Sequence, residues 1–185
     1  MNLLINDVKK ALDAEAYFAA LSLVLTLPDI CAKAEYGDTI KSNKKRYIKW
    51  YDKYIGQNQK APPCEGEPPF PYLSGEVVYS LRNCVLHQGE PTIEKEKITD
   101  EINKIDYFEL CIQKENRCGA YVDSAHIQAN SEGVVTERSY CVNVRRLCST
   151  ICGHALWYYN NNLEKFDFSH VNIVDWDKEI EQLRS

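Results

Sequence analysis

The longest apolar run of the chain, "AYFAALSLVLTL" from Ala16 to Leu27, limits most strongly what the chain can fold into. A membrane-spanning helix needs about 20 apolar residues, so this run of twelve is too short to cross a bilayer. Pro28 follows it and is expected to end the helix. We therefore predict a buried central helix, capped by Asn6 or Asp7, that reaches about Leu27, and no membrane association.

The composition fits one globular domain, residues 1–185. Hydrophobic residues make up 44% of the chain and charged residues 26%, and the length suffices for a core without covalent staples. The net charge of -5 argues against a protein that coats nucleic acid nonspecifically, but it allows an enzyme that grips a short RNA segment through a local basic patch. The N-terminal "MNLLINDVKK" has no secretory signal, which predicts a cytoplasmic protein whose eight cysteines are free thiols.

The spacing of the cysteines bears on whether the chain binds a metal. Cys141, Cys148 and Cys152 are seven and four residues apart, on one face of a predicted helix. The chain has no Cys-x-x-Cys pair and no pair of histidines at zinc-finger spacing. Free cysteine behaves as a small apolar residue, so core filling is favoured over zinc binding. We expect neither a metal nor another cofactor.

Two serines mark the starts of further helices. Ser42 is expected to cap a helix from Asn43 to about Ile55, and Ser74 to cap one that runs to Leu86 or His87. The segment 56–71 between them holds five of the seven prolines and is predicted to be a surface loop.

The helix from Asn43 carries an aromatic stripe and a separate lysine stripe. Aromatic residues interleaved with lysines can stack on RNA. The two sets separate by helical period, which favours buried aromatics and a solvated lysine face. The stripes are Tyr47, Trp50, Tyr51 and Tyr54, and Lys45, Lys49 and Lys53.

After Ile105 the pattern changes to short β-rich segments. "DYFELCIQ" and "AYVDSAHIQ" predict a β-hairpin at about residues 105–128, with its turn at "KENRCG". Thr136 or Ser139 is then expected to begin a long helix, about 140–161, and the tail from Phe166 to pack along the bundle edge. The predicted fold class is mainly α, a bundle of four or five helices with a small inserted β-hairpin.

A polar line crosses the first predicted helix. Glu15, Ser22, Thr26 and Asp29 recur at helical spacing. The line is either a solvent-facing seam or a surface that faces another helix, where a carboxylate pairs with a cation.

The segment "SLRNCVLHQG" combines residue types suited to RNA cleavage near a predicted helix end that Gly89 closes. The guanidinium of Arg82 can stabilise a phosphate or phosphorane, and His87 can act as acid or base near neutral pH. Asn83 can orient either partner. On an ideal helix Arg82 and His87 diverge by about 140°. An ordinary capped helix end remains the alternative interpretation.

An arginine followed by asparagine and then histidine, near a helix end in an all-α bundle, resembles the HEPN superfamily. The matching residues are Arg82, Asn83 and His87 in "RNCVLH", and the resemblance covers roughly residues 6–90 and 140–162. It implies a four-helix bundle and a metal-independent ribonuclease of toxin–antitoxin, abortive-infection or RNA-processing type. It further implies a composite site where the Arg–His helices of a homodimer meet. The hairpin is not part of the minimal family pattern.

Three hypotheses follow for the function. In the first, the chain is a HEPN-like endoribonuclease with Arg82, Asn83 and His87 as catalytic residues, and Asp29 or Glu15 as a partner of Arg82. In the second, it is a non-catalytic HEPN-like module that binds a nucleotide or a protein, such as an antitoxin. In the third, it is a structural helical protein. The first predicts that Arg82 and His87 share one exposed cleft.

Overall fold

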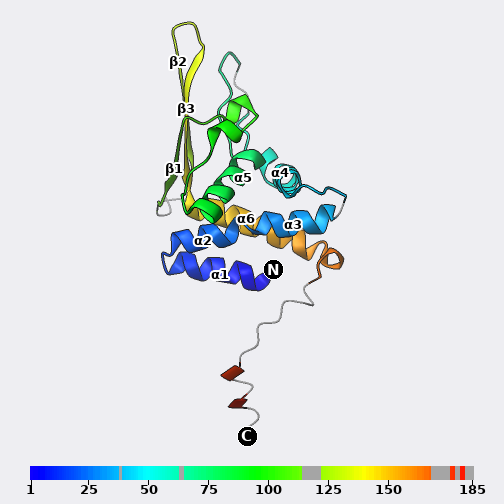
Figure 1. Ribbon diagram of the computed structural model, residues 1–185. Helices are drawn as coiled ribbons and strands as arrows, with labels where there is room; N and C mark the ends of the chain where they lie inside the picture. The colour runs from blue at the N-terminus through cyan, green and yellow to red at the C-terminus, as the bar shows by residue number, and fades with distance from the viewer. Residues whose placement is uncertain (38, 63–64, 114–121, 168–175, 178–179, 182–185) are drawn as a thin grey trace.

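The computed structural model describes residues 1–37, 39–62, 65–113, 122–167, 176–177 and 180–181 (Figure 1). The described part is mainly α, as predicted. Its six α-helices are α1 (Asn2–Asp13), α2 (Tyr17–Val24), α3 (Leu27–Tyr36), α4 (Asn43–Tyr54), α5 (Gly75–Asn83) and α6 (Val144–Asn160). Its three strands are β1 (Tyr107–Cys111), β2 (Ser124–Ala129) and β3 (Val135–Asn143).

The first predicted helix is two helices in the structure. The chain turns back at Ala14–Ala16, where Glu15 has a φ of 55°, and α1 then lies along α2 (Figure 1). The turn lets the apolar face of α1, with Ile5 and Val8 buried, pack against its neighbours. A continuous helix would leave that face exposed, so packing outweighs local helix propensity here.

Helix α2 ends at Val24, close to the predicted end at about Leu27, and a separate helix, α3, begins at Leu27. Pro28 lies in the first turn of α3, where its missing N–H has no helical acceptor to lose. The helical stretch Tyr17–Tyr36 then has 20 residues with a mean hydropathy of 1.4, long and apolar enough by composition to cross a membrane. Its most apolar window is 44% buried inside the protein, which is compatible with a core helix of a soluble protein.

The sheet differs from the predicted hairpin. Strand β3 is central and pairs in parallel with β1 and antiparallel with β2, so β1 and β2 do not pair with each other. The predicted hairpin turn lies in residues 114–121, outside the described residues. Residues 136–143 form strand rather than the start of a helix, since Tyr140 and Val142 insert into the core from β3.

The last long helix begins at Val144, where the side chain of Asn143 caps it by accepting hydrogen bonds from the backbone N–H groups of Arg145 and Arg146. Within it Leu147, Ile151 and Tyr158 are buried, whereas His154 is only half-buried. Helix α6 packs against α1, α2 and α3, and lies behind α2 and α3 in the view of Figure 1.

The aromatic stripe of α4 is core. Tyr47, Trp50 and Tyr51 are fully buried, and Trp50 packs edge-on against Tyr158 of α6. These three rings are therefore not free to stack on RNA. Phe166 packs against Tyr158 and Tyr159, and most of the tail beyond it lies outside the described residues.

The cysteines in the described part of the chain are free thiols, namely Cys31, Cys84, Cys111, Cys141, Cys148 and Cys152. Cys64 and Cys118 lie outside it. Burial raises the pKa of Cys31 and Cys148 to about 12, so both are neutral, apolar core groups.

Candidate functional site

Helix α5 ends in a wider turn that reorients His87. The side chain of Ser74 caps the helix by accepting from the N–H of Val77, as predicted. Cys84–Gln88 then form a π turn, which closes on Gly89 in the left-handed conformation with a φ of 73°. A π turn needs more residues per revolution than an α-helix. It therefore brings residues five apart back toward the same side, which an ideal α-helix does not.

The π turn brings Arg82 and His87 into contact. Arg82 Nη1 lies 3.1 Å from His87 Nε2 and 3.0 Å from Oδ1 of Asn83, to which it donates. An arginine can only donate, so this contact corresponds to an imidazole that accepts at Nε2 and carries its proton on Nδ1. His87 is exposed, whereas the Arg82 side chain is 21% exposed.

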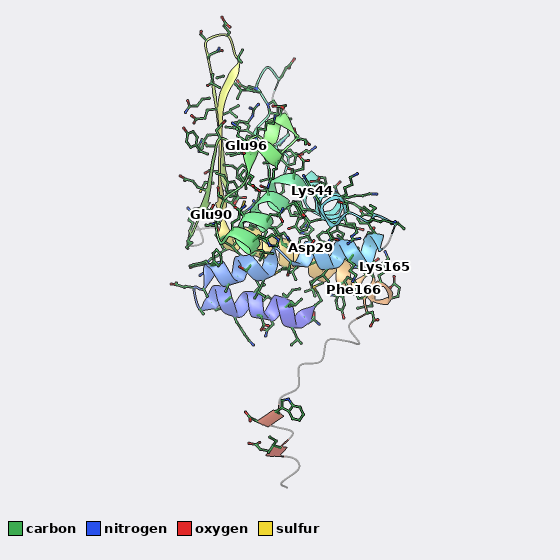
Figure 2. All side chains as sticks on the ribbon, in the orientation of Figure 1. Asp29, Lys44, Glu90, Glu96, Lys165 and Phe166 are labelled. Carbon is green, nitrogen blue, oxygen red and sulfur yellow. The ribbon has the colours of Figure 1, made fainter. Side chains whose placement is uncertain are left out.

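Asp29 holds the other side of the guanidinium. Arg82 Nε and Nη2 lie 3.1 and 3.0 Å from Asp29 Oδ2. Asp29 lies in the first turn of α3, on the side that faces α4 and α5 (Figure 2). Burial raises the pKa of Asp29, and the neighbouring Arg82 offsets this only in part. The ion pair therefore carries a desolvation penalty at neutral pH.

Of the two carboxylates predicted as partners of Arg82, the structure brings only Asp29 to it. Glu15 lies in the exposed turn between α1 and α2, at the far end of the helical stretch from Asp29. Ser22 and Thr26 of the predicted polar line donate to backbone carbonyls of α2, at Phe18 and Leu23. The predicted line is thus not one continuous functional surface.

Three residues near this site were not predicted from the sequence. Lys33, Asn43 and Arg46 line a pocket with Asp29 and Arg82. The spacing of Asp29 and Lys33, four apart on one helix, was an available signal. Arg46 gave none, because it belongs to the polar run "NKKR" that predicts only a solvated helix face.

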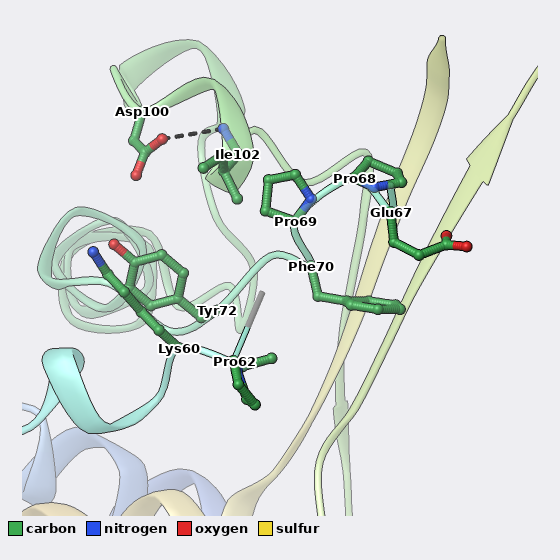
Figure 3. Close-up of a pocket in the computed structure, with 10 residues that line it drawn as sticks. Lys60, Pro62, Glu67, Pro68, Pro69, Phe70, Tyr72, Asp100 and Ile102 are labelled. Carbon is green, nitrogen blue, oxygen red and sulfur yellow. Dashed lines mark hydrogen bonds between the residues drawn. The ribbon is translucent and has the colours of Figure 1, made fainter. Parts of the chain in front are cut away.

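A separate cavity of about 130 Å³ lies between the proline-rich loop and residues 100–102 (Figure 3). Two of its charged side chains, those of Asp100 and Lys60, contact other groups of the protein. The carboxylate of Asp100 accepts from the N–H of Ile102 and from Asn103, and the ammonium of Lys60 lies 5.0 Å from the Tyr72 ring centre. These contacts stabilise the loop.

Comparison with known proteins found no match: no family model, curated protein or solved structure matches the chain.

Proposed function

We propose that this protein is a HEPN-like, metal-independent endoribonuclease whose site is built on Arg82, Asn83 and His87. The observation that carries the proposal is the 3.1 Å contact between Arg82 Nη1 and His87 Nε2 at the exposed end of α5. A guanidinium and an imidazole at this separation can bind one phosphate together. In the described residues no cluster of His, Cys, Asp or Glu is arranged to hold a metal ion.

In the proposed reaction the nucleophile belongs to the substrate. Arg82 Nη1 turns from His87 Nε2 to the phosphate, which frees the Nε2 lone pair of the neutral imidazole. The 2′-hydroxyl then attacks the adjacent phosphorus and loses its proton to this Nε2. A bond forms between 2′-O and phosphorus, and the bond from phosphorus to 5′-O breaks. The departing 5′-oxygen takes a proton from an imidazolium. Arg82 stabilises the charge of the phosphorane, and Asn83 holds the guanidinium in place.

The proposed site is completed in a homodimer. In-line transfer benefits from groups at both the attacking and the leaving oxygen, but one chain offers a single His87 here. A two-fold contact through residues 74–88 would place two such histidines in one cleft. One then serves as base and the other as acid.

One observation favours the alternative of a non-catalytic HEPN-like module that binds a nucleotide or a partner protein, such as an antitoxin. Asp29 already occupies Nε and Nη2 of Arg82, which lowers the positive charge available to a transition state. In this alternative His87 and Arg82 bind a phosphate without cleaving it.

The test is incubation of the purified protein with total RNA in excess EDTA. We expect cleavage products with 5′-hydroxyl and 2′,3′-cyclic phosphate ends, and loss of at least about 100-fold in rate for His87→Ala, within the range of general acid–base catalysis. An RNA with 2′-deoxyribose at the cut site should resist. Intact RNA with wild-type protein, or equal cleavage by Arg82→Ala and wild type, contradicts the ribonuclease proposal.

A further inference from the structure

A polar pocket of about 260 Å³ adjoins the candidate site on the side away from His87. Its lining comes from three helices: Asp29 and Lys33 from α3, Asn43 and Arg46 from α4, and Arg82 from α5. Arg82 belongs to both the pocket and the candidate site, so a chain bound at His87 would have the pocket beside it.

The charges that line this pocket are unbalanced. Lys33, Arg46 and Arg82 are cationic, and Asp29 is the one carboxylate among its lining residues. Arg46 and Arg82 both act on Asp29 electrostatically, so the two guanidinium groups share a single counter-ion. Among the described residues that line it, the pocket thus has a formal excess of positive charge.

Arg46 is fixed at the pocket wall. Its Nη1 donates to the backbone carbonyls of Gly37 and Ile40, at 3.2 and 2.7 Å, and its Nη2 donates to Oδ1 of Asn43. All these partners are neutral oxygens, so the guanidinium keeps its charge while its position is held. A charge held in advance costs little further ordering when an anion binds.

Lys33 supplies the adaptable cation of the pocket. It is exposed and lies four residues after Asp29, on the same face of α3. Its flexible stem can reach an anion in the pocket without moving the backbone. A fixed guanidinium and a mobile ammonium together suit a phosphate group whose remaining oxygens stay solvated.

We propose that this pocket binds a phosphodiester of the single-stranded RNA substrate next to the phosphate held by Arg82 and His87. The identity of the ligand as RNA rests on the proposed function. The pocket would bind without reacting, because its lining has no histidine and its one carboxylate, Asp29, is held in the ion pair with Arg82. It would set the path of the strand across α3 and α4.

The experiment measures binding of a short oligouridylate with 2′-O-methyl on every ribose, which lacks the attacking hydroxyl. Lys33→Gln is compared with Lys10→Gln, an exposed lysine of α1 outside the pocket. We expect Lys33→Gln to weaken binding at least about threefold and to lower the slope of log K against log salt by about 0.7, the value for one phosphate contact on a single strand. Lys10→Gln should change neither quantity.

Binding and cleavage separate the two proposals. Reduced binding by Lys33→Gln supports the pocket even if wild-type protein cleaves no RNA. Equal affinity and equal salt dependence for Lys33→Gln and wild type overturn the pocket proposal, even if cleavage depends on Arg82 and His87. Equal thermal melting of Lys33→Gln and wild type serves as the folding control. A second variant, Arg46→Lys, keeps the positive charge but loses the planar guanidinium, and it should bind the oligouridylate more weakly than wild type.

Discussion

Arg82 divides its hydrogen-bonding groups between a structural ion pair and the candidate site. Nε and Nη2 face Asp29, while Nη1 faces Asn83 and His87. Both ion-pair partners remain partly exposed, at 21% and 27% of their side chains, so solvent weakens the pair. The counter-ion can therefore be removed at small cost to the fold.

Asp29→Asn tests this directly. The amide keeps a neutral acceptor near Arg82 but removes the negative charge, so we expect the free energy of unfolding to change by no more than about 1 kcal/mol. Affinity for the 2′-O-methyl oligouridylate should rise, because Arg82 gains net charge for the phosphate. Glu15→Gln, a carboxylate change away from Arg82, is the matched control in urea unfolding and binding. Weaker binding by Asp29→Asn would show that Asp29 orients Arg82 rather than neutralising it.

At Glu35, hydrogen bonds outweigh burial in setting the pKa of the carboxyl group, whereas at Asp29 burial outweighs the neighbouring cation. Its side chain is 11% exposed and accepts from Lys53 and Tyr54 at Oε1, and from Tyr158 and Lys165 at Oε2. Burial alone would raise the pKa of Glu35, but these four donors lower it to about 2. The carboxylate joins α3 to α4 and α6.

We expect Glu35→Gln to lower the free energy of unfolding at neutral pH by about 2 kcal/mol, the range for hydrogen bonds to a charged group. Because the folded pKa lies below the ordinary value of 4.5, the stabilisation is present above pH 4.5 and is lost as pH falls toward 2. Urea unfolding across this range should therefore show a steeper acid loss for wild type than for Glu35→Gln. The exposed Glu164→Gln should keep the wild-type slope.

At the scale of elements, the contact between α4 and α5 positions the helix that carries Arg82. Gly75, the first residue of α5, lies so close to α4 that an added Cβ would be 2.7 Å from the carbonyl oxygen of Ile48 and 2.9 Å from its Cα. The N–H of Gly75 donates to Asp52 Oδ1 at 2.6 Å. Both contacts involve α4, so they fix where α5 begins.

Gly75→Ala is expected to destabilise the protein by about 3 kcal/mol, at the upper end of overpacking costs, because the neighbouring atoms are backbone. Gly153→Ala is the matched control. It lies within α6 with no atom within 4 Å of an added Cβ, so helix propensity predicts a gain of about 0.5–1 kcal/mol. Thermal or urea unfolding of both variants measures the difference. A neutral Gly75→Ala would mean that α5 can shift on α4.

The helix starts capped by Ser42 and Ser74 were predicted correctly from the sequence. Those of α1 and α6 were not, because α1 begins at Asn2 rather than after a cap at Asn6 or Asp7, and Asn143 rather than Thr136 or Ser139 precedes α6. Strand pairing and chain reversal were not predictable either. Ser42 and Ser74 act as local caps, and Gly89 adopts the positive φ expected after a helix. The turn at Glu15 and the central place of β3 depend on partners far along the chain, which local patterns do not contain.

The candidate site was predictable in its residue types but not in its geometry. Local spacing indicated Arg82, Asn83 and His87, and Asp29 was one of two proposed partners of Arg82. The π turn that brings His87 to Arg82 has no simple sequence signature. Arg46 reaches the pocket only because α4 crosses α3, so its place near Asp29 could not be read from the chain.

At the scale of the whole molecule, the net charge of -5 bears on both RNA binding and self-association. An acidic protein repels RNA at long range, so binding has to depend on the local cationic residues around Arg82. Two such chains also repel each other, so the proposed dimer contact through residues 74–88 needs an apolar centre. Both interactions should therefore depend on salt, with opposite signs: added salt weakens RNA binding and strengthens the dimer.

The final prediction concerns mixed dimers of two inactive variants. Arg82→Ala and His87→Ala each lack one of the proposed groups, and a homodimer of either variant should be inactive. Mixing the two should restore only a small part of the cleavage, because a mixed dimer contains one Arg82 and one His87 in a shared cleft but lacks the second histidine that serves as acid or base. Cleavage by wild type should also fall more steeply than protein concentration once dilution passes the dimer dissociation constant. The measurements are initial cleavage rates in EDTA together with the mass in solution at each concentration. The two-chain site would be contradicted if the wild-type protein were monomeric at every concentration and cleaved at a rate proportional to its concentration. Arg82 and His87 would then have to act within one chain, where the π turn already places them 3.1 Å apart.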